Sequence, residues 1–304
     1  MSLSTQRPRL TPDSPAGEVV FAYLAEQARA LDALDPMVRR DEPDAVHQMR
    51  VATRRLRSTL RTYHRVTGDA GHLAGELKWL GDVLGEARDA EVLADHIRTE
   101  LDAIAPEQVV GPVRARIQIH FAPVAAQARD AVLAALDSER YASLVDELGR
   151  LIAEPAAQPW AAKPAGDVLP RAVRRSYRKT ARRMARARRA APGPAADTAL
   201  HQARKAAKQA RYASEVAEPA MGRAAARFTR QAKKVQSLLG EHHDSVIARQ
   251  QERALGMAAH LAGENAFTYG LLYERESEAA GALRRRARAA WKKASGRKYR
   301  AWMT

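Results

Sequence analysis

The chain has 304 residues, a formal net charge of +16 and no cysteine, which excludes disulfide bonds and thiolate chemistry. It contains no apolar window of about 18 residues and no apolar run near its start, so we expect a cytoplasmic protein without a membrane partner. Aromatic residues make up 5% of the chain and no segment alternates polar and apolar residues as a strand does, which predicts an all-α fold.

Apolar periodicity predicts helices on both sides of a Pro- and Ala-rich stretch. The helices before it cover residues 18–40, 44–66, 70–101, 109–136 and 141–152, and those after it cover residues 170–189, 197–216, 223–255 and 264–294. We therefore predict two four-helix bundles, over residues 17–152 and 171–294, joined by a linker over residues 153–170. Residues 1–16 and 295–304 are predicted to be flexible termini.

The two halves share two sequence blocks. The segment HQMRVATRRLRSTLR from His47 returns as HQARKAAKQARYASE from His201, and LGDVLGEARDAEVLADH from Leu80 corresponds to QSLLGEHHDSVIARQ from Gln236. The offset is 154 residues at the histidines and 155 between Asp89 and Asp244. Two separated blocks at nearly one offset predict an internal duplication, with halves related by a pseudo-two-fold axis. Asp44 and Asp197 are the predicted N-caps of the two helices that carry the histidines.

The first histidine begins a row of cations on its helix. At about 100° per residue the row falls within an arc of about 80°, beside the apolar seam that should face the core. The row contains His47, Arg50, Arg54, Arg57 and Arg61. It extends about 21 Å, since an α-helix rises about 1.5 Å per residue. A row of this length suits an extended polyanion better than a single phosphate.

Most of the cationic excess lies in the second half. Residues 1–152 contain 19 Lys and Arg against 23 Asp and Glu, a net charge of −4, whereas residues 153–304 contain 32 against 12, a net charge of +20. Residues 171–189 carry ten basic side chains and no acid. Such a helix repels itself, and an anionic partner would relieve the repulsion, although a solvated surface in an Arg-rich protein is the simpler alternative.

The histidines and aspartates of the repeated blocks have more than one interpretation. His47 and His201 could each hydrogen-bond a neighbouring loop, or donate to a phosphate oxygen. The segment GEHHD at residues 240–244 superficially resembles the His-Asp metal pair of phosphohydrolases, but no further ligands are placed beside it. We expect Asp89 and Asp244 to orient a neighbouring Arg or His.

Gly85 and Gly240 lie within predicted helices, where glycine costs about 1 kcal/mol relative to alanine. We expect both to permit close helix packing.

The two blocks together resemble the CHAD family (conserved histidine α-helical domain). The motif V-H-x-x-R-v-x-x-R-R-L-R followed by L-G-x-x-R-D is matched by VHQMRVATRRLR from Val46 with LGEARD from Leu84, and more loosely by LHQARKAAKQARY from Leu200 with LLGEHHD from Leu238. The resemblance covers residues 17–294. It implies two four-helix bundles around a basic central channel that binds inorganic polyphosphate without catalysis, and association with polyphosphate granules.

The resemblance and the cation rows together give the candidate binding residues. They are His47, Arg50, Arg54, Arg57, Arg61, Arg88, Arg174, Arg178, Arg182, His201, Arg204, Lys208, Arg211, Lys234 and His243. The second copy has Glu215 in place of Arg61 and His243 in place of Arg88, so it is expected to hold the ligand differently. We assign no catalytic residue, metal or cofactor, and do not expect an enzyme.

Two other functions compete with polyphosphate binding. The basic segment RRRARAAWKKASGRKYR from Arg284 would suit a nucleic-acid backbone, but no base-reading motif accompanies it and aromatic residues are too sparse for a stacking platform. A metal-dependent phosphohydrolase is the third and weakest candidate, because it depends on the GEHHD segment alone.

Overall fold

The computed structural model describes residues 9–303 and consists of helices joined by short loops. The first half contains α1 (Ala16–Arg39), α2 (Ala45–Thr62), α3 (His64–Thr67), α4 (Gly71–Asp102), the 3-10 turn η1 (Pro106–Gln108), α5 (Val113–Leu136) and α6 (Glu139–Ala153). The second half contains α7 (Ala165–Arg189), α8 (Pro194–Met221), α9 (Arg223–Leu261), α10 (Phe267–Ala294), α11 (Arg297–Arg300) and the 3-10 turn η2 (Ala301–Met303). The all-α prediction is confirmed. None of the helices formed by the described residues is both long and apolar enough to cross a membrane.

Helix α7 begins earlier than the sequence predicts. It starts at Ala165 and includes Pro170, which the sequence analysis assigned to the linker. Pro170 lies inside α7, beyond its first turn, so the helix lacks the backbone hydrogen bond that residue 170 would otherwise donate to the carbonyl of Gly166. The segment without helix between the halves is therefore reduced to residues 154–164.

The described parts of the two termini are tied to the protein, in contrast to the flexible ends expected for residues 1–16 and 295–304. Pro12 and Ser14 each accept a backbone hydrogen bond from the start of α7, at 2.8 Å. At the other end, Tyr299 and Met303 are buried in the main core. Residues 1–8 and Thr304, which were also predicted to be flexible, lie outside the described part of the chain.

The starts of α1 and α7 bind each other reciprocally. The N–H groups of Ala16 and Gly17 donate to the carbonyls of Lys163 and Ala161, at 2.8 and 2.9 Å. The start of α7 donates back to the segment before α1 in the same way, and Pro15 and Pro164 form an antiparallel bridge between the two strands of backbone. Both segments read Pro-Ala-Gly followed by an acid and Val. The two halves are therefore joined by backbone hydrogen bonds where each of them begins.

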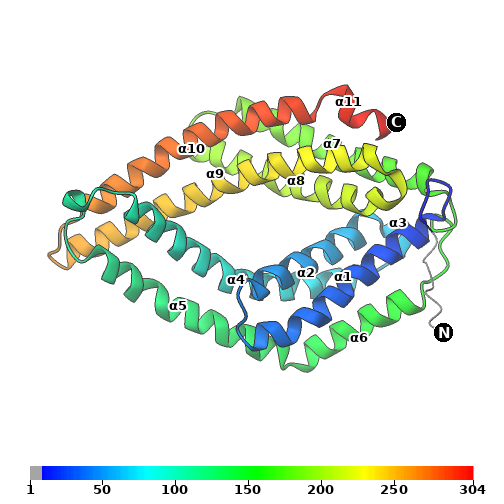
Figure 1. Cartoon of the computed structure of the whole chain (residues 1–304), viewed down its shortest axis with the longest axis horizontal. Helices are drawn as coiled ribbons and strands as arrows, with labels where there is room; N and C mark the ends of the chain where they lie inside the picture. The colour runs from blue at the N-terminus through cyan, green and yellow to red at the C-terminus, as the bar shows by residue number, and fades with distance from the viewer. Residues whose placement is uncertain (1–8, 304) are drawn as a thin grey trace, which may run out of the picture.

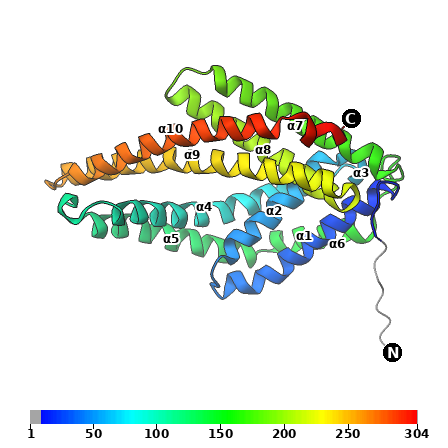
Figure 2. The same cartoon turned by 45° about the horizontal axis from the view of Figure 1, so that its top comes forward.

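Helices that follow one another in the chain pack against one another. In the first half α2 packs on α1 and α4, and α5 packs on α4; in the second half α8 packs on α7 and α9, and α10 packs on α9. Figure 1 shows the two halves on opposite sides of the molecule, blue to green for α1–α6 and green to red for α7–α11, and meeting at both ends. Figure 2, turned by 45°, places α9 and α10 alongside α4 and α5.

The cores show that the halves are less independent than two separate bundles. The largest core combines α1, α2, α4 and α6 with parts of α7, α8 and α9, so that Leu24 and Leu56 share it with Val173 and Phe228. The second half also has a core made by its four long helices alone, around Met184 of α7 and the residues that face it.

A third core closes the opposite end of the molecule. There α4 and α5 of the first half pack on α9 and α10 of the second, through residues that include Ile97, Ile117, Leu255 and Leu272. The halves are consequently joined by apolar packing at two separate places. The internal duplication itself stays a prediction, although the reciprocal helix starts agree with it.

Candidate anion-binding cavity

A cavity of about 820 Å³ lies between the two halves and is lined by α2, α4, α7, α8 and α9. Its lining is strongly cationic. The Lys and Arg residues that line it are Arg50, Arg54, Arg57, Arg61, Lys78, Lys179, Arg183, Arg204, Lys205 and Lys208. Against these ten cations stand three carboxylates, Asp82, Asp89 and Asp244. The cavity therefore carries a large positive excess and is suited to a polyanion.

The sequence of α2 explains why its arginines reach the cavity. Met49, Thr53, Leu56 and Leu60 are buried and fix one face of the helix against the core. The cation row lies beside this face, as predicted, and Arg50, Arg54, Arg57 and Arg61 all line the cavity. Arg50, Arg54 and Arg57 are partly buried and Arg61 is exposed, so the row passes from the interior of the cavity toward solvent.

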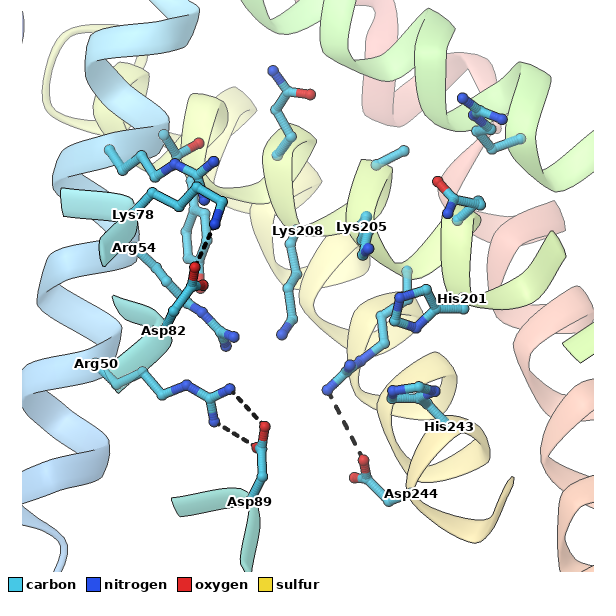
Figure 3. Close-up of a pocket in the computed structure, with 18 of the residues that line it drawn as sticks. Arg50, Arg54, Lys78, Asp82, Asp89, His201, Lys205, Lys208, His243 and Asp244 are labelled. Atoms are coloured by element: carbon cyan, nitrogen blue, oxygen red, sulfur yellow. Dashed lines mark hydrogen bonds and ion pairs between the residues drawn. The ribbon is translucent and has the colours of Figure 1, made fainter. Parts of the chain in front are cut away.

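Corresponding arginines of the two halves each face an aspartate. Arg50 on α2 donates to Asp89 on α4 through both Nη atoms, at 2.7 and 3.1 Å. Arg204, the corresponding residue on α8, lies 4.0 Å from Asp244 on α9. Figure 3 shows Arg50 with its partner Asp89, and Asp244 on the facing side of the cavity. The aspartates therefore orient arginines, in agreement with the sequence analysis.

Gly85 and Gly240 accommodate these same arginines. A methyl group at Gly85 would lie 3.1 Å from Nη2 of Arg50, which is closer than an ordinary contact, and one at Gly240 would lie 3.7 Å from Nε of Arg204. Both glycines are predicted from the sequence to permit close packing between helices. The structure instead shows an arginine side chain lying over each glycine.

Lys208 of α8 and Arg54 of α2 extend toward each other across the cavity (Figure 3). Burial, together with the nearby guanidinium groups of Arg204, Arg54 and Arg50, lowers the pKa of Lys208 to about 7, while Asp244 acts in the opposite direction. A lysine in this state gains its charge readily when an anion arrives. An anion bound beside Lys208 would therefore be held more tightly as this side chain takes up a proton.

The histidines of the second copy pack on each other. The rings of His201 and His243 have their centroids 4.3 Å apart, and Nδ1 of His201 is buried without a hydrogen-bond partner. Burial lowers the pKa of His243 to about 4, and Arg204 acts in the same direction. Burial also lowers the pKa of His201 and His47, so all three favour the neutral ring.

A buried acidic pair lies beyond the cavity wall at His96. This histidine lines the cavity and hydrogen-bonds Glu276, which is buried and shares its surroundings with Glu252. Both carboxylate oxygens of Glu252 lack a hydrogen-bond partner. Burial, followed by repulsion from Glu276, raises the pKa of Glu252 to about 8, so this side chain is mostly protonated at neutral pH.

Eight of the fifteen candidate residues line the cavity. They are Arg50, Arg54, Arg57, Arg61, His201, Arg204, Lys208 and His243. The other seven do not line it: His47, Arg88, Arg174, Arg178, Arg182, Arg211 and Lys234. His47 is close to the cationic lining, since the guanidinium groups of Arg88 and Arg50 add to the lowering of its pKa by burial. Arg88 itself pairs with Glu91 at 2.9 Å, and Lys234 is exposed on α9.

The face of α7 that lines the cavity carries other basic residues than those predicted from the sequence. Arg174, Arg178 and Arg182 are exposed, whereas Lys179 and Arg183 line the cavity. The buried residues of α7 include small and polar side chains such as Ser176 and Thr180, so the core-facing side is weakly marked in the sequence. With ten basic residues around this helix, basic character alone does not identify a face.

Arg211 is not a free cation. Its Nε donates to Glu215 at 2.6 Å, and the same carboxylate accepts from the Arg55 guanidinium and the Tyr23 hydroxyl, each at 3.2 Å. Glu215 thereby connects α8 with α1 and α2. Glu215, which aligns with Arg61 of the first block, therefore provides a link between the halves.

The structure also adds residues that the sequence analysis missed. Lys78, Lys179, Arg183 and Lys205 line the cavity, and Lys78 pairs with Asp82 one turn further along α4. Lys78 lies outside both repeated blocks. Lys205 is adjacent to Arg204 within the second block. At the offset of 154 residues it corresponds to Val51 of the first block, so comparison of the two blocks does not mark it as a cation site.

The two adjacent histidines of GEHHD point to different places. His242 is buried and lies 3.5 Å from Asp197, which also pairs with Arg249, whereas His243 faces the cavity. Asp197 therefore lies inside α8 and is not its N-cap; Asp44 does occupy the N-cap position of α2, but its carboxylate accepts from the Gln48 side chain. Within residues 9–303, no group of three or more His, Asp or Glu side chains is placed to hold a metal ion.

The sequence matches a known family model and two curated relatives. A family model described as CHAD domain matches residues 22–252. Two uncharacterized proteins of Mycobacterium tuberculosis, Rv2226 and MT2285, are each 40% identical over 285 residues, which is 92% of this chain and 53% of theirs. The chain thus spans about half the length of these curated relatives.

Two solved structures share the fold. PptA from Streptomyces chartreusis superposes with a TM-score of 0.76 at 20% identity, over 92% of this chain and 100% of that one. The CHAD domain from the plant Ricinus communis superposes with a TM-score of 0.72 at 26% identity, over 93% of this chain and 95% of that one. The helical arrangement around the cavity is therefore not peculiar to this sequence.

Proposed function

Because this chain belongs to the CHAD domain family, we propose that it binds inorganic polyphosphate in the central cavity, which serves as a basic channel between the two halves. The observation that carries the proposal is the convergence of ten Lys and Arg side chains, from both halves, on one cavity with three carboxylates. A linear polyanion can contact cations along the whole cavity, whereas orthophosphate can contact only a few.

The hydrogen-bonding state of the lining supports an anionic ligand. The Nε atoms of Arg50, Arg57 and Arg204 are buried and have no hydrogen-bond partner, and Nδ1 of His201 is in the same state. Buried donors without a partner cost free energy, which an oxygen-rich ligand would recover. Bringing these cations together is also unfavourable, and a polyanion reverses the sign of that interaction.

We propose binding without turnover. Asp89 and Asp244 face arginines, and Asp82 pairs with Lys78, so each carboxylate that lines the cavity has a cationic partner. Arginines and lysines that hold the substrate and the transition state equally well do not lower the barrier. Incubation with polyphosphate and Mg²⁺, Mn²⁺ or Zn²⁺ should release no orthophosphate above a protein-free blank. Metal-dependent release that disappears in Asp244→Asn would establish a hydrolase instead.

The test of the binding site compares two triple variants of equal charge. Arg50, Arg54 and Arg57 replaced by Gln remove three charges from the cavity, while retaining helix propensity and most of the side-chain length. Replacement of Arg285, Arg286 and Arg288 by Gln removes three exposed charges from α10. The first variant should lose far more affinity for long-chain polyphosphate than the second, with similar melting temperatures. Equal losses would show diffuse charge attraction and refute a specific site.

Nucleic acid is the competing ligand, and mutual displacement separates the two. Polyphosphate should displace labelled duplex DNA at equal phosphate concentration, and DNA should not displace labelled polyphosphate. Equal displacement in both directions would leave only a generic cationic surface. Affinity for polyphosphate should also fall steeply with salt, because each neutralised phosphate releases counterions.

The cellular part of the proposal is association with polyphosphate granules in the cytoplasm. A fluorescent fusion of the chain should colocalise with stained granules, and the Arg50, Arg54 and Arg57 triple variant should not. Colocalisation of both proteins would show that granule association does not depend on the cavity.

A further inference from the structure

A second basic cavity, of about 370 Å³, lies beside the central one at the loop that joins α7 to α8. It is lined by Arg183, Arg186 and Arg189 of α7, by the loop residue Ala190, and by the first turns of α8, including Thr198 and Gln202. Arg183 and Gln202 line both cavities. The two spaces are therefore neighbours that share two side chains. Figure 2 shows the α7–α8 pair along the upper edge of the molecule.

The arginines of the second cavity are not engaged by acids. None of Arg183, Arg186 and Arg189 forms an ion pair with a carboxylate of residues 9–303. No carboxylate lines the second cavity. The acid nearest in sequence, Asp197 in the first turn of α8, instead pairs with Arg249, away from this space. The second cavity thus has cations without the aspartates that accompany those of the central cavity.

The positions of the three arginines continue the cationic lining of the central cavity. From Arg183 to Arg189, helix α7 rises about 9 Å. Thr198 and Gln202 lie across from them on α8 and can donate hydrogen bonds to an oxygen-rich ligand. The amino-terminal end of α8 adds the partial positive charge of the helix dipole to the same place.

We propose that this second cavity is an anion subsite that holds the phosphates of a long chain where it leaves the central cavity between α7 and α8. The inference rests on the proposed function, and it adds an exit direction and a requirement on length. A short polyphosphate would occupy the central cavity alone. A long chain would occupy both, with Arg183 contacting it at the junction.

The test uses two double variants on the same helix. Arg186→Gln with Arg189→Gln alters the second cavity and leaves Arg183, which belongs to both cavities, in place. Arg178→Gln with Arg182→Gln removes the same charge from exposed positions of α7 that line neither cavity. All four side chains are exposed, so both variants should fold, which circular dichroism and thermal melting would verify.

Binding is measured with tripolyphosphate and with polyphosphate of several tens of phosphates. We expect the Arg186 and Arg189 variant to lose roughly tenfold in affinity for the long chain and to bind tripolyphosphate within about twofold of the original protein. The slope of log affinity against log salt for the long chain should decrease by about 1.4, the amount expected for two lost phosphate contacts on a single strand. The Arg178 and Arg182 variant should show neither change.

Three results would overturn the subsite. They are an unchanged long-chain affinity in the Arg186 and Arg189 variant, an equal loss in the two double variants, and an equal loss for the short and long ligands. Each of these leaves the proposed function intact if the original protein still binds polyphosphate. Failure of the original protein to bind either ligand would refute the proposed function itself, and the subsite with it.

Discussion

Polyphosphate binding should be coupled to proton uptake at Lys208. This side chain lies in the cavity among Arg50 and Arg54 of α2 and Arg204 of its own helix, with Asp244 of α9 as the nearest opposing charge and His243 beside it. Burial and these guanidinium groups lower the pKa of Lys208 to about 7. A bound polyanion supplies negative charge at the same place and favours the ammonium form.

The size of the effect follows from the pKa of about 7 for Lys208. In the free protein Lys208 is about one-tenth protonated at pH 8 and about nine-tenths protonated at pH 6, so full protonation on binding takes up about 0.9 proton at pH 8 and about 0.1 at pH 6. Affinity should therefore be nearly independent of pH below the pKa. Above it, affinity should fall by about tenfold per pH unit from this residue alone.

Isothermal titration calorimetry in buffers of different ionisation enthalpy measures this uptake directly. Lys208→Arg is the matched variant, because arginine keeps the positive charge and stays protonated throughout this pH range. It should lower the uptake at pH 8 by about 0.9 proton and retain binding. Uptake that remains in the variant belongs to other groups, of which the neutral rings of His201 and His243 are the nearest in the cavity. Equal uptake by the two proteins at pH 8 would refute the reasoning.

Three further predictions concern stability and the arginine pairs. Gly240→Ala should raise the free energy of unfolding by up to about 1 kcal/mol and leave polyphosphate binding unchanged, because the added methyl makes an ordinary contact with Arg204. Gly85→Ala should gain less stability and weaken binding, because Arg50 must move; equal behaviour of the two variants would contradict the role given to Gly85. Glu252→Gln should become more stable relative to the original protein as pH rises from about 5 to 8, by up to about 1.4 kcal/mol per pH unit, because the folded protein holds a proton there that the unfolded chain releases. A stability difference that does not vary with pH, in urea titrations across this range, would show that Glu252 is ionised in the fold. Glu215→Gln should cost about 2 kcal/mol in the same titrations, since it leaves Arg55 and Arg211 without their shared carboxylate, and a loss below about 0.5 kcal/mol would count against that link.

The sequence predicts a cavity residue well where an apolar seam fixes the orientation of its helix. On α2, Met49, Leu56 and Leu60 mark the buried face, so the neighbouring row from Arg50 to Arg61 could be placed correctly. Recurrence of the block at His201 extends the same prediction to Arg204 and Lys208 on α8.

On α7 the same reasoning fails because the contrast between the apolar and the polar face is weak in the middle of the helix. Between Val173 and Met184 its buried face consists of Ser176 and Thr180, so the apolar seam that would orient the basic side chains is interrupted near Lys179. Ion pairs formed in the folded protein are a second reason why predicted cavity residues are wrong. Arg211 matches the pattern of a cavity cation, but Glu215 one turn later occupies it, and no periodicity reports which of two neighbouring polar residues will pair.

The apolar packing at both ends of the molecule has a consequence for how the cavity works. The halves are joined by the large core and the reciprocal helix starts at one end, and by the α4, α5, α9 and α10 core at the other. This packing opposes opening and closing on a ligand in the manner of hinged lobes. The cations are instead held in place before any ligand arrives, and the folding energy of the two cores keeps them together. In the proposed function, a polyphosphate chain would enter a preorganised site and bear most of the ordering cost itself. Affinity would then rise with the stiffness of the ligand, and we expect the protein to move little between its free and bound states.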